Sequence, residues 1–287
     1  MSENQYNIGV FDSGFGGLSI LREIRRILPQ YSYIYLGDNA RAPYGTRSFE
    51  TVYRYTLEAV TKLFEMNCNL VIIAGNTASA KALRNIQQND LQRFGADKRV
   101  LGIIRPCTEI ANTFTQNNNL GIVATKGTVT SKSYEIEIKK FFPDITITSH
   151  ACPMWVPIVE NGEYNSDGAD YFVKKELDAL LCENPNIDAL LLGCTHYPLL
   201  LQKIRKHLPE HIKIIQQGEI VAHSLQAYLK KHSALESTLK RTNEIQFFTT
   251  DSKDSFNAIG TLLNFIVSLK NRLISRIPIV GKYIYIK

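Results

Sequence analysis

Short apolar segments alternate with helical patterns along most of the chain, and this alternation limits the folds open to it. Segments suited to β-strands recur at 6–11, 33–36, 70–74, 100–104, 120–124, 145–149, 189–192, 212–216 and 245–250. Between most of them lie helical patterns. In 48–66, apolar residues four, three and four positions apart are Tyr53, Leu57, Val60 and Phe64. Strands that alternate with such helices form βαβ units, so the sequence predicts an α/β fold with mostly parallel sheets.

The chain of 287 residues is longer than one average domain. We expect two facing, pseudo-symmetric α/β domains with a ligand cleft between them. The first should comprise residues 1–97 and 211–270, and the second residues 98–210. The pattern at 252–270 predicts a last helix. The apolar, basic segment 271–287 is expected to be a C-terminal tail that packs on the body as a strand or arm, or else contacts a membrane surface or a partner.

Polar turns follow several of the predicted strands. Open parallel sheets bind ligands at the carboxyl ends of their strands, which makes these turns the candidate binding segments. They are residues 12–17, 38–45, 75–77, 125–128 and 194–196.

Two of these turns resemble each other, because each leads from an apolar run through small or polar residues into a helical pattern. In the alignment of the two turns, Gly75 falls opposite Cys194, Asn76 opposite Thr195, and Thr77 opposite His196. Two halves of a pseudo-symmetric site would each present such a turn to one small ligand. Only one of the two turns carries a thiol.

Cys194 is the leading candidate for a reactive group. At the end of a strand, just before a helix, backbone N–H groups and the helix dipole favour a thiolate. In a small dry cavity such a thiolate can move a proton at a carbon next to a carboxylate, if fixed donors stabilise the carbanion. Donors of this kind are available in Asn76, Thr77, Thr195 and backbone N–H groups. The side chains of His196 and Asp12 could tune the thiol or handle protons beside it.

Three other kinds of site are not expected. A dinucleotide fingerprint would need glycine at position 19, where Ser19 stands, and Asp12 would repel a pyrophosphate. A zinc site is not expected, because Cys194 and His196 lack further ligands at a recognised spacing. A Cys–His hydrolase pair usually comes from different elements, whereas these two residues share one turn.

Composition narrows the cellular setting and the partners. The chain has an odd number of cysteines at irregular spacing and no evident signal peptide, so we expect free thiols in a reducing, cytoplasmic compartment. No apolar run approaches the roughly 18–20 residues of a membrane span. The net charge is +6, but from Phe256 onward there are basic residues and no acid. Because this tail carries most of the excess, nucleic-acid binding is not expected.

A set of motifs, taken together, resembles glutamate racemase, within the aspartate/glutamate racemase superfamily. The resemblance covers residues from about 6 to 270. The motifs are Asp12-Ser13-Gly14-Phe15-Gly16-Gly17-Leu18, Asp38-Asn39-Ala40-Arg41-Ala42-Pro43-Tyr44-Gly45, Asn76-Thr77-Ala78-Ser79, Cys152-Pro153 with Pro157-Ile158-Val159-Glu160, and Gly193-Cys194-Thr195-His196-Tyr197-Pro198.

The resemblance implies interconversion of L- and D-glutamate without a cofactor or metal, supplying D-glutamate for peptidoglycan, and often a homodimer. It implies two cysteines on opposite faces of the substrate, with Cys194 working on the L-glutamate face and His196 and Asp12 in catalytic roles. The substrate-binding residues expected from it are Asp12, Ser13, Tyr44, Gly45, Asn76, Thr77, Thr128, Thr195 and His196.

The sequence departs from the family at one position, where Gly75 stands in place of the first catalytic cysteine. A normal two-thiol racemisation is therefore not expected. The glycine is explained by an engineered inactive form, by a natural or sequencing variant, or by a change of chemistry. In the last case the chain would donate a proton from one face only, like arylmalonate decarboxylase. A non-catalytic amino-acid-binding protein is a further alternative.

Two other cysteines and one acid lie near these motifs. Cys107 is expected on a turn at the end of a strand and Cys152 in a structural role, and neither is expected to replace the missing thiol. Glu160 either assists His196 or is an ordinary acid at a helix end.

Overall fold

The computed structural model describes residues 5–252 and 273–276. Its strands form two sheets in which every paired strand is parallel. The first sheet has the order β10-β9-β2-β1-β3-β4, and its strands are β1 (Asn7–Asp12), β2 (Tyr33–Gly37), β3 (Cys68–Ile73), β4 (Arg99–Gly102), β9 (Ile245–Thr249) and β10 (Leu273–Arg276). The second has the order β6-β5-β7-β8, with β5 (Asn119–Ala124), β6 (Thr146–Ala151), β7 (Ala189–Gly193) and β8 (Lys213–Ile215).

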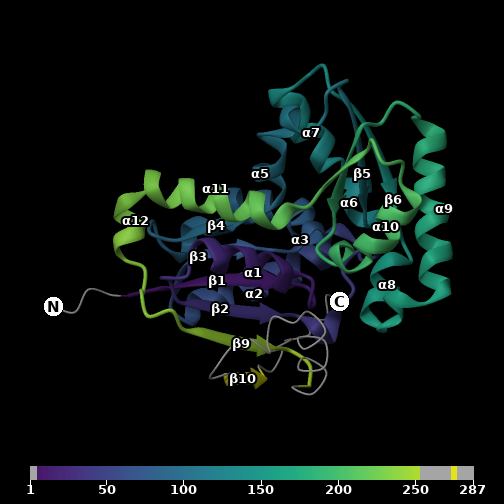
Figure 1. Ribbon diagram of the computed structural model, residues 1–287. Helices are drawn as coiled ribbons and strands as arrows, with labels where there is room; N and C mark the ends of the chain where they lie inside the picture. Colours follow the sequence, from purple (N-terminus) through teal and green to yellow (C-terminus); the bar gives the residue numbers. More distant parts are fainter. Residues whose placement is uncertain (1–4, 253–272, 277–287) are drawn as a thin grey trace, which may run out of the picture.

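Helices cover both faces of each sheet. They are α1 (Gly17–Ile27), α2 (Phe49–Glu65), α3 (Asn76–Lys81), α4 (Leu83–Asn85), α5 (Ile104–Thr108), α6 (Lys126–Ser131), α7 (Ser133–Phe141), α8 (Trp155–Glu160), α9 (Asp167–Glu183), α10 (Leu201–His207), α11 (Gln217–Lys231) and α12 (Ser233–Ser237). Figure 1 shows the two sheets side by side, with α9 on the outer side of the smaller one and α11 running alongside the larger one.

The continuous apolar character of the strands follows from this double coverage, because alternate side chains of a strand enter the cores on opposite faces. In β7, Leu190 and Leu192 join a core with residues of α8, α9 and α10. Its neighbour Leu191 joins the opposite core, with residues of α5 and α7. The larger sheet is likewise packed between two cores, one on the side of α1 and α11 and one on the side of α2.

The predicted α/β class with parallel sheets is confirmed, and a strand lies at each of the nine predicted positions. The helical pattern at 48–66 corresponds to α2. This helix begins after Ser48, whose hydroxyl accepts a hydrogen bond from the backbone N–H of Thr51 and so caps the helix. The segment 252–270, for which a last helix was expected, lies outside the described residues except for Ser252. Within the tail, β10 pairs with β9, as expected for a strand packed on the body.

Two strands do not lie in the sheet that the expected domain boundaries imply. The strand β4 follows residue 97 but pairs with β3 in the larger sheet. The strand β8 follows residue 211 but pairs with β7 in the smaller sheet. Strand pairing is a long-range property, and nothing in the local sequence marks which sheet a boundary strand joins. A second correction concerns Cys107, which lies buried in α5 rather than on a turn.

Candidate active site

A cavity of about 90 Å³ lies where the carboxyl ends of strands from the two sheets face each other. The turns after β1 and β3 reach it from the larger sheet, and those after β5 and β7 from the smaller one. It is lined by Asp12, Ser13, Pro43, Tyr44, Gly45, Thr46, Gly75, Asn76, Thr77, Thr125, Lys126, Cys152, Pro153, Val156, Pro157, Glu160, Cys194, Thr195 and His196. Its size suits one small molecule.

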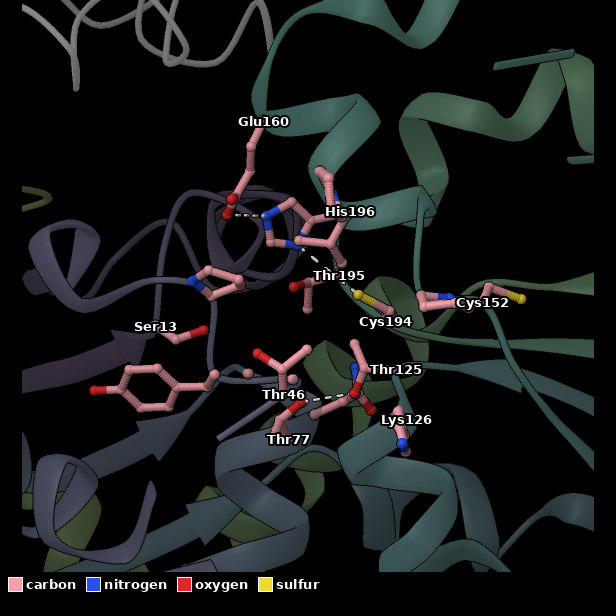
Figure 2. A pocket seen from close by; sticks show the side chains of 18 of the residues that line it. Ser13, Thr46, Thr77, Thr125, Lys126, Cys152, Glu160, Cys194, Thr195 and His196 are labelled. Carbon is pink, nitrogen blue, oxygen red and sulfur yellow. Dashed lines mark hydrogen bonds and ion pairs between the residues drawn. The ribbon is translucent and has the colours of Figure 1, made fainter. Parts of the chain in front are cut away.

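The thiol of Cys194 has an imidazole beside it (Figure 2). Its Sγ lies 3.8 Å from Nδ1 of His196, and Nε2 of that ring lies 3.3 Å from Oε1 of Glu160. The second contact is close enough for an ion pair, although it is not aligned as a hydrogen bond. Burial alone would lower the pKa of His196, but Cys194 and Glu160 outweigh burial and raise that pKa well above its ordinary value. A protonated His196 stabilises a thiolate at Cys194.

Gly75 presents no side chain to the cavity, and the Asp12 carboxyl group lies beside it. An ideal Cβ on Gly75 would lie closer than 3.0 Å to Oδ1 of Asp12. The other oxygen, Oδ2, accepts a 2.8 Å hydrogen bond from the backbone N–H of Gly17. Asp12 is only 1% exposed, and burial raises its pKa. The carboxyl group therefore holds a proton more readily than an exposed aspartate does.

Gly16, in the turn after β1, allows the turn after β7 to approach closely. A Cβ on Gly16 would collide with Oγ1 of Thr195 and lie 2.6 Å from Nδ1 of His196. Hydrogen bonds join the halves nearby, with the hydroxyl of Ser19 donating to the carbonyl oxygen of Thr195 (3.2 Å). Because Gly16 has no side chain, the turn that carries Thr195 and His196 can pack directly against it.

Polar side chains around Asn76 and Thr77, which follow Gly75, are held in two hydrogen-bond networks. The hydroxyls of Thr77 and Thr125 lie 2.9 Å apart. Figure 2 marks this hydrogen bond with a dashed line. The amide of Asn76 donates to Gln217 (2.8 Å) and accepts from the hydroxyl of Tyr134 (2.6 Å). All five side chains are buried, so their orientations are fixed before a ligand arrives.

The loop after β2 reaches the same cavity. The hydroxyl of Tyr44 donates to Asp38, which also pairs with Arg41. Beside it, the carbonyl oxygen of Gly45 accepts a 2.9 Å hydrogen bond from the backbone N–H of Gly127 at the start of α6. This bond joins the loop of the larger sheet to the smaller one.

A sequence profile of the Asp/Glu/hydantoin racemase family matches residues 8–225, most of the chain. The chain belongs to this family. It is 39% identical over 257 residues to the glutamate racemase of Persephonella marina, covering 90% of this chain and 93% of that protein. It is 38% identical over 267 residues to the glutamate racemase of Enterococcus faecalis, covering 93% and 95%.

Solved structures of this racemase family have the same fold. A glutamate racemase of Bacillus anthracis superposes with a TM-score of 0.85 at 34% identity, covering 96% of this chain and 98% of that one. The glutamate racemase of Francisella tularensis in complex with D-glutamate gives a TM-score of 0.82 at 30% identity, covering 96% and 98%. The predicted resemblance to glutamate racemase and the prediction of an amino-acid racemase are confirmed.

In this racemase family member, all but one of the residues expected at the site line one cavity. They are Asp12, Ser13, Tyr44, Gly45, Gly75, Asn76, Thr77, Cys194, Thr195 and His196. The exception is Thr128, which was expected to contact the substrate. It lies outside the cavity wall, with its hydroxyl 3.1 Å from that of Thr125. At the start of α6, the residues that reach the cavity are Thr125, which caps the helix, and Lys126.

Sequence reasoning missed several residues of the racemase site. Thr125 and Lys126 belong to a polar turn that was recognised, but no pattern shows which of its side chains faces a ligand. Thr46 follows another such turn. No local signal marks Tyr134 or Gln217, because their link to Asn76 depends on the packing of distant segments.

Within residues 5–252 and 273–276, no three His, Cys, Asp or Glu side chains are grouped to hold a metal ion. No helix in those residues is long and apolar enough to cross a membrane.

Proposed function

We propose that this chain interconverts L- and D-glutamate by proton transfer at the α-carbon, without a cofactor. The observation that carries the proposal is the thiol of Cys194, 3.8 Å from the buried imidazole of His196 in a cavity sized for one small molecule. We infer the substrate from the relatives, since the glutamate racemases of Persephonella marina and Enterococcus faecalis are similar to this chain over most of its length. Supply of D-glutamate for peptidoglycan is the corresponding role.

The cavity has the charges that this reaction needs. His196 and Lys126 are cationic groups that attract the substrate carboxylates, and the hydroxyls of Thr77 and Thr195 are hydrogen-bond donors. In the proposed step, the Cys194 thiolate takes the α-proton of L-glutamate. The electron pair stays on the substrate as a carbanion that delocalises into its carboxylate. Fixed donors stabilise this charge more effectively than water does, because they are already oriented.

We expect this racemisation to be slow, because Gly75 supplies no thiol. A family member with two cysteines has a thiol on each face of the substrate, whereas this chain has a thiol on one face. Loss of a general base typically lowers a rate by about 10²–10⁴-fold. Substrate binding does not depend on that thiol and is expected to persist.

Exchange of the α-proton in D₂O tests the proposal. Incubation with L-glutamate should replace the α-proton by deuterium, as followed by NMR, and Cys194→Ser should reduce this exchange about 100-fold or more. The matched control is Cys182→Ser, since Cys182 is an exposed cysteine on α9. Equal exchange by the Cys194→Ser variant and the unchanged chain would refute the thiol mechanism.

A second candidate reaction rests on the missing side chain at position 75. With one thiol and glycine opposite, the site resembles that of arylmalonate decarboxylase, which protonates a carbanion from one face. Release of CO₂ from a disubstituted malonate, together with no exchange of L-glutamate, would favour this reaction. The converse result would favour the racemase.

A further inference from the structure

The space left open by Gly75 is occupied by a carboxyl group. A side chain at position 75 would begin at a Cβ lying closer than 3.0 Å to Oδ1 of Asp12. We propose that the Asp12 carboxyl group takes the place of the missing thiol and transfers protons at the α-carbon on the face opposite Cys194. This inference rests on the proposed function and assigns the second group that its reaction needs.

A hydrogen bond orients the carboxyl group of Asp12. Its Oδ2 accepts the hydrogen bond from Gly17, at 2.8 Å, which leaves Oδ1 on the side of Gly75. The position of Gly17 is itself tightly packed, because a Cβ there would lie 2.6 Å from Cβ of Asp12. Asp12 ends β1, next to β3 in the sheet, and Gly75 follows β3. Both residues line the cavity that Cys194 enters from the other sheet.

Other side chains on this side of the cavity are less suited to proton transfer. The Tyr44 hydroxyl donates to Asp38, and burial raises its pKa well above the ordinary value. Asn76 has no titratable proton, and the hydroxyl of Thr77 is bonded to Thr125. Asp12 is therefore the acidic group that lines the cavity on this side, within the described residues.

The remaining cysteines near the site do not compete. The thiol of Cys107 lies outside the cavity wall and accepts a hydrogen bond from Gln217 (3.7 Å). Figure 2 shows the sulfur of Cys152 directed away from Cys194. Burial raises the pKa of both thiols, to about 12 for Cys107, so neither supplies a thiolate near neutral pH.

The protons balance in both directions of the reaction. From L-glutamate, the Cys194 thiolate breaks the α C–H bond and becomes a thiol. Protonated Asp12 then gives its proton to the opposite face of the carbanion and becomes a carboxylate. From D-glutamate, the Asp12 carboxylate takes the α-proton and the Cys194 thiol returns one. The raised pKa of Asp12 supports this role, because a buried carboxyl group can hold the proton that it must donate.

Exchange of each enantiomer in D₂O tests the assignment with Asp12→Asn, which keeps the size of the side chain and an acceptor for Gly17. The variant should retain exchange of L-glutamate within a few-fold and lose exchange of D-glutamate and racemisation by about 100-fold or more. The double variant Asp12→Asn with Gly75→Cys should regain D-glutamate exchange, because a thiol then serves that face. Asp144→Asn, on an exposed acid, is the matched control.

Each outcome decides between the assignments. Unchanged D-glutamate exchange in Asp12→Asn would overturn the inference. Loss of exchange for both enantiomers, not restored by Gly75→Cys, would show a structural role for Asp12 and would also overturn it. Exchange of L-glutamate but not D-glutamate by the unchanged chain would overturn the inference but leave the proton transfer by Cys194 intact. Exchange of neither enantiomer would overturn the proposed function and the inference with it.

Discussion

The side chain of Asn76 donates a 2.8 Å hydrogen bond to Oε1 of Gln217, 141 residues further along the chain. Asn76 begins α3 above the larger sheet, and Gln217 begins α11 directly after the last strand of the smaller sheet. The hydroxyl of Tyr134 closes the network by donating to Asn76 and accepting from the Gln217 amide. This buried ring of hydrogen bonds fixes the turn that carries Gly75 against the second sheet.

Gln217→Ala should therefore destabilise the protein, because it removes the acceptor of the buried Asn76 amide N–H and the donor to the buried Tyr134 hydroxyl. Unsatisfied groups of this kind cost about 1–3 kcal/mol of unfolding free energy. Urea denaturation measures the difference, and Gln202→Ala, at an exposed position of α10, is the control. Equal losses in the two variants would contradict the importance of the network.

Gly16→Ala should inactivate the site with little effect on the backbone. Gly16 has φ −57° and ψ −36°, which alanine adopts freely, so the consequence of the new Cβ is its collision with Thr195 and His196. We expect about a 100-fold loss of L-glutamate exchange, as for a displaced catalytic group. Gly168→Ala is the control, because its Cβ would meet its nearest atom, Oγ of Ser166, at 3.5 Å. Full activity of Gly16→Ala would show that the two turns can separate without consequence.

Glu160→Gln should lower the pKa of His196, because it removes the carboxylate that stabilises the protonated ring. A histidine whose pKa is raised by folding contributes stability below its ordinary pKa of 6.5 and loses that contribution as the pH rises through the raised value. Glu160→Gln should thus be about 1 kcal/mol less stable than the unchanged chain near pH 6, and the difference should shrink at higher pH.

NMR titration of the His196 ring and urea denaturation over a pH series measure both effects of Glu160→Gln. Glu163→Gln serves as the control, since Glu163 is exposed and lies three residues away. An unchanged titration of His196 would show that Glu160 does not influence the ring.

Gly75→Cys should raise the rate of racemisation by about 100-fold, because it supplies the second thiol of the family. Gly75 has φ −88° and ψ 130°, an extended conformation that cysteine accepts, and Oδ1 of Asp12 must shift to admit the new Cβ. Gly75→Ala makes the same steric change without a thiol and should not raise the rate. Polarimetry with L-glutamate gives both values, and no gain for Gly75→Cys would point to a different reaction.

Much of the fold was predictable because its signals are local. The apolar runs and helical spacings identified all nine strands within residues 5–252, since a strand buried on both faces must be apolar at every position. The candidate residues were predictable for a related reason. Parallel strands end at one edge of a sheet, so the polar turn after each strand marks that edge, as Cys194, Thr195 and His196 do after β7.

Other features lay beyond local patterns. Which sheet β4 or β8 belongs to depends on strand pairing with segments far away in the chain. The helical position of Cys107 likewise depends on packing with distant segments. The turn 125–128 was recognised as polar, but the rotation of α6 decides that Lys126 reaches the cavity and Thr128 does not.

The order of strands and helices, the family motifs and the presence of Cys194 opposite a glycine were determined by the sequence alone, because each is written in neighbouring residues. Only the tertiary structure decided what occupies the space at Gly75. The Asp12 carboxyl group lies there because parallel pairing of β1 with β3 brings together the ends of two strands whose turns are about sixty residues apart. Contacts of that range depend on how the sheets assemble, and no spacing in the sequence encodes them.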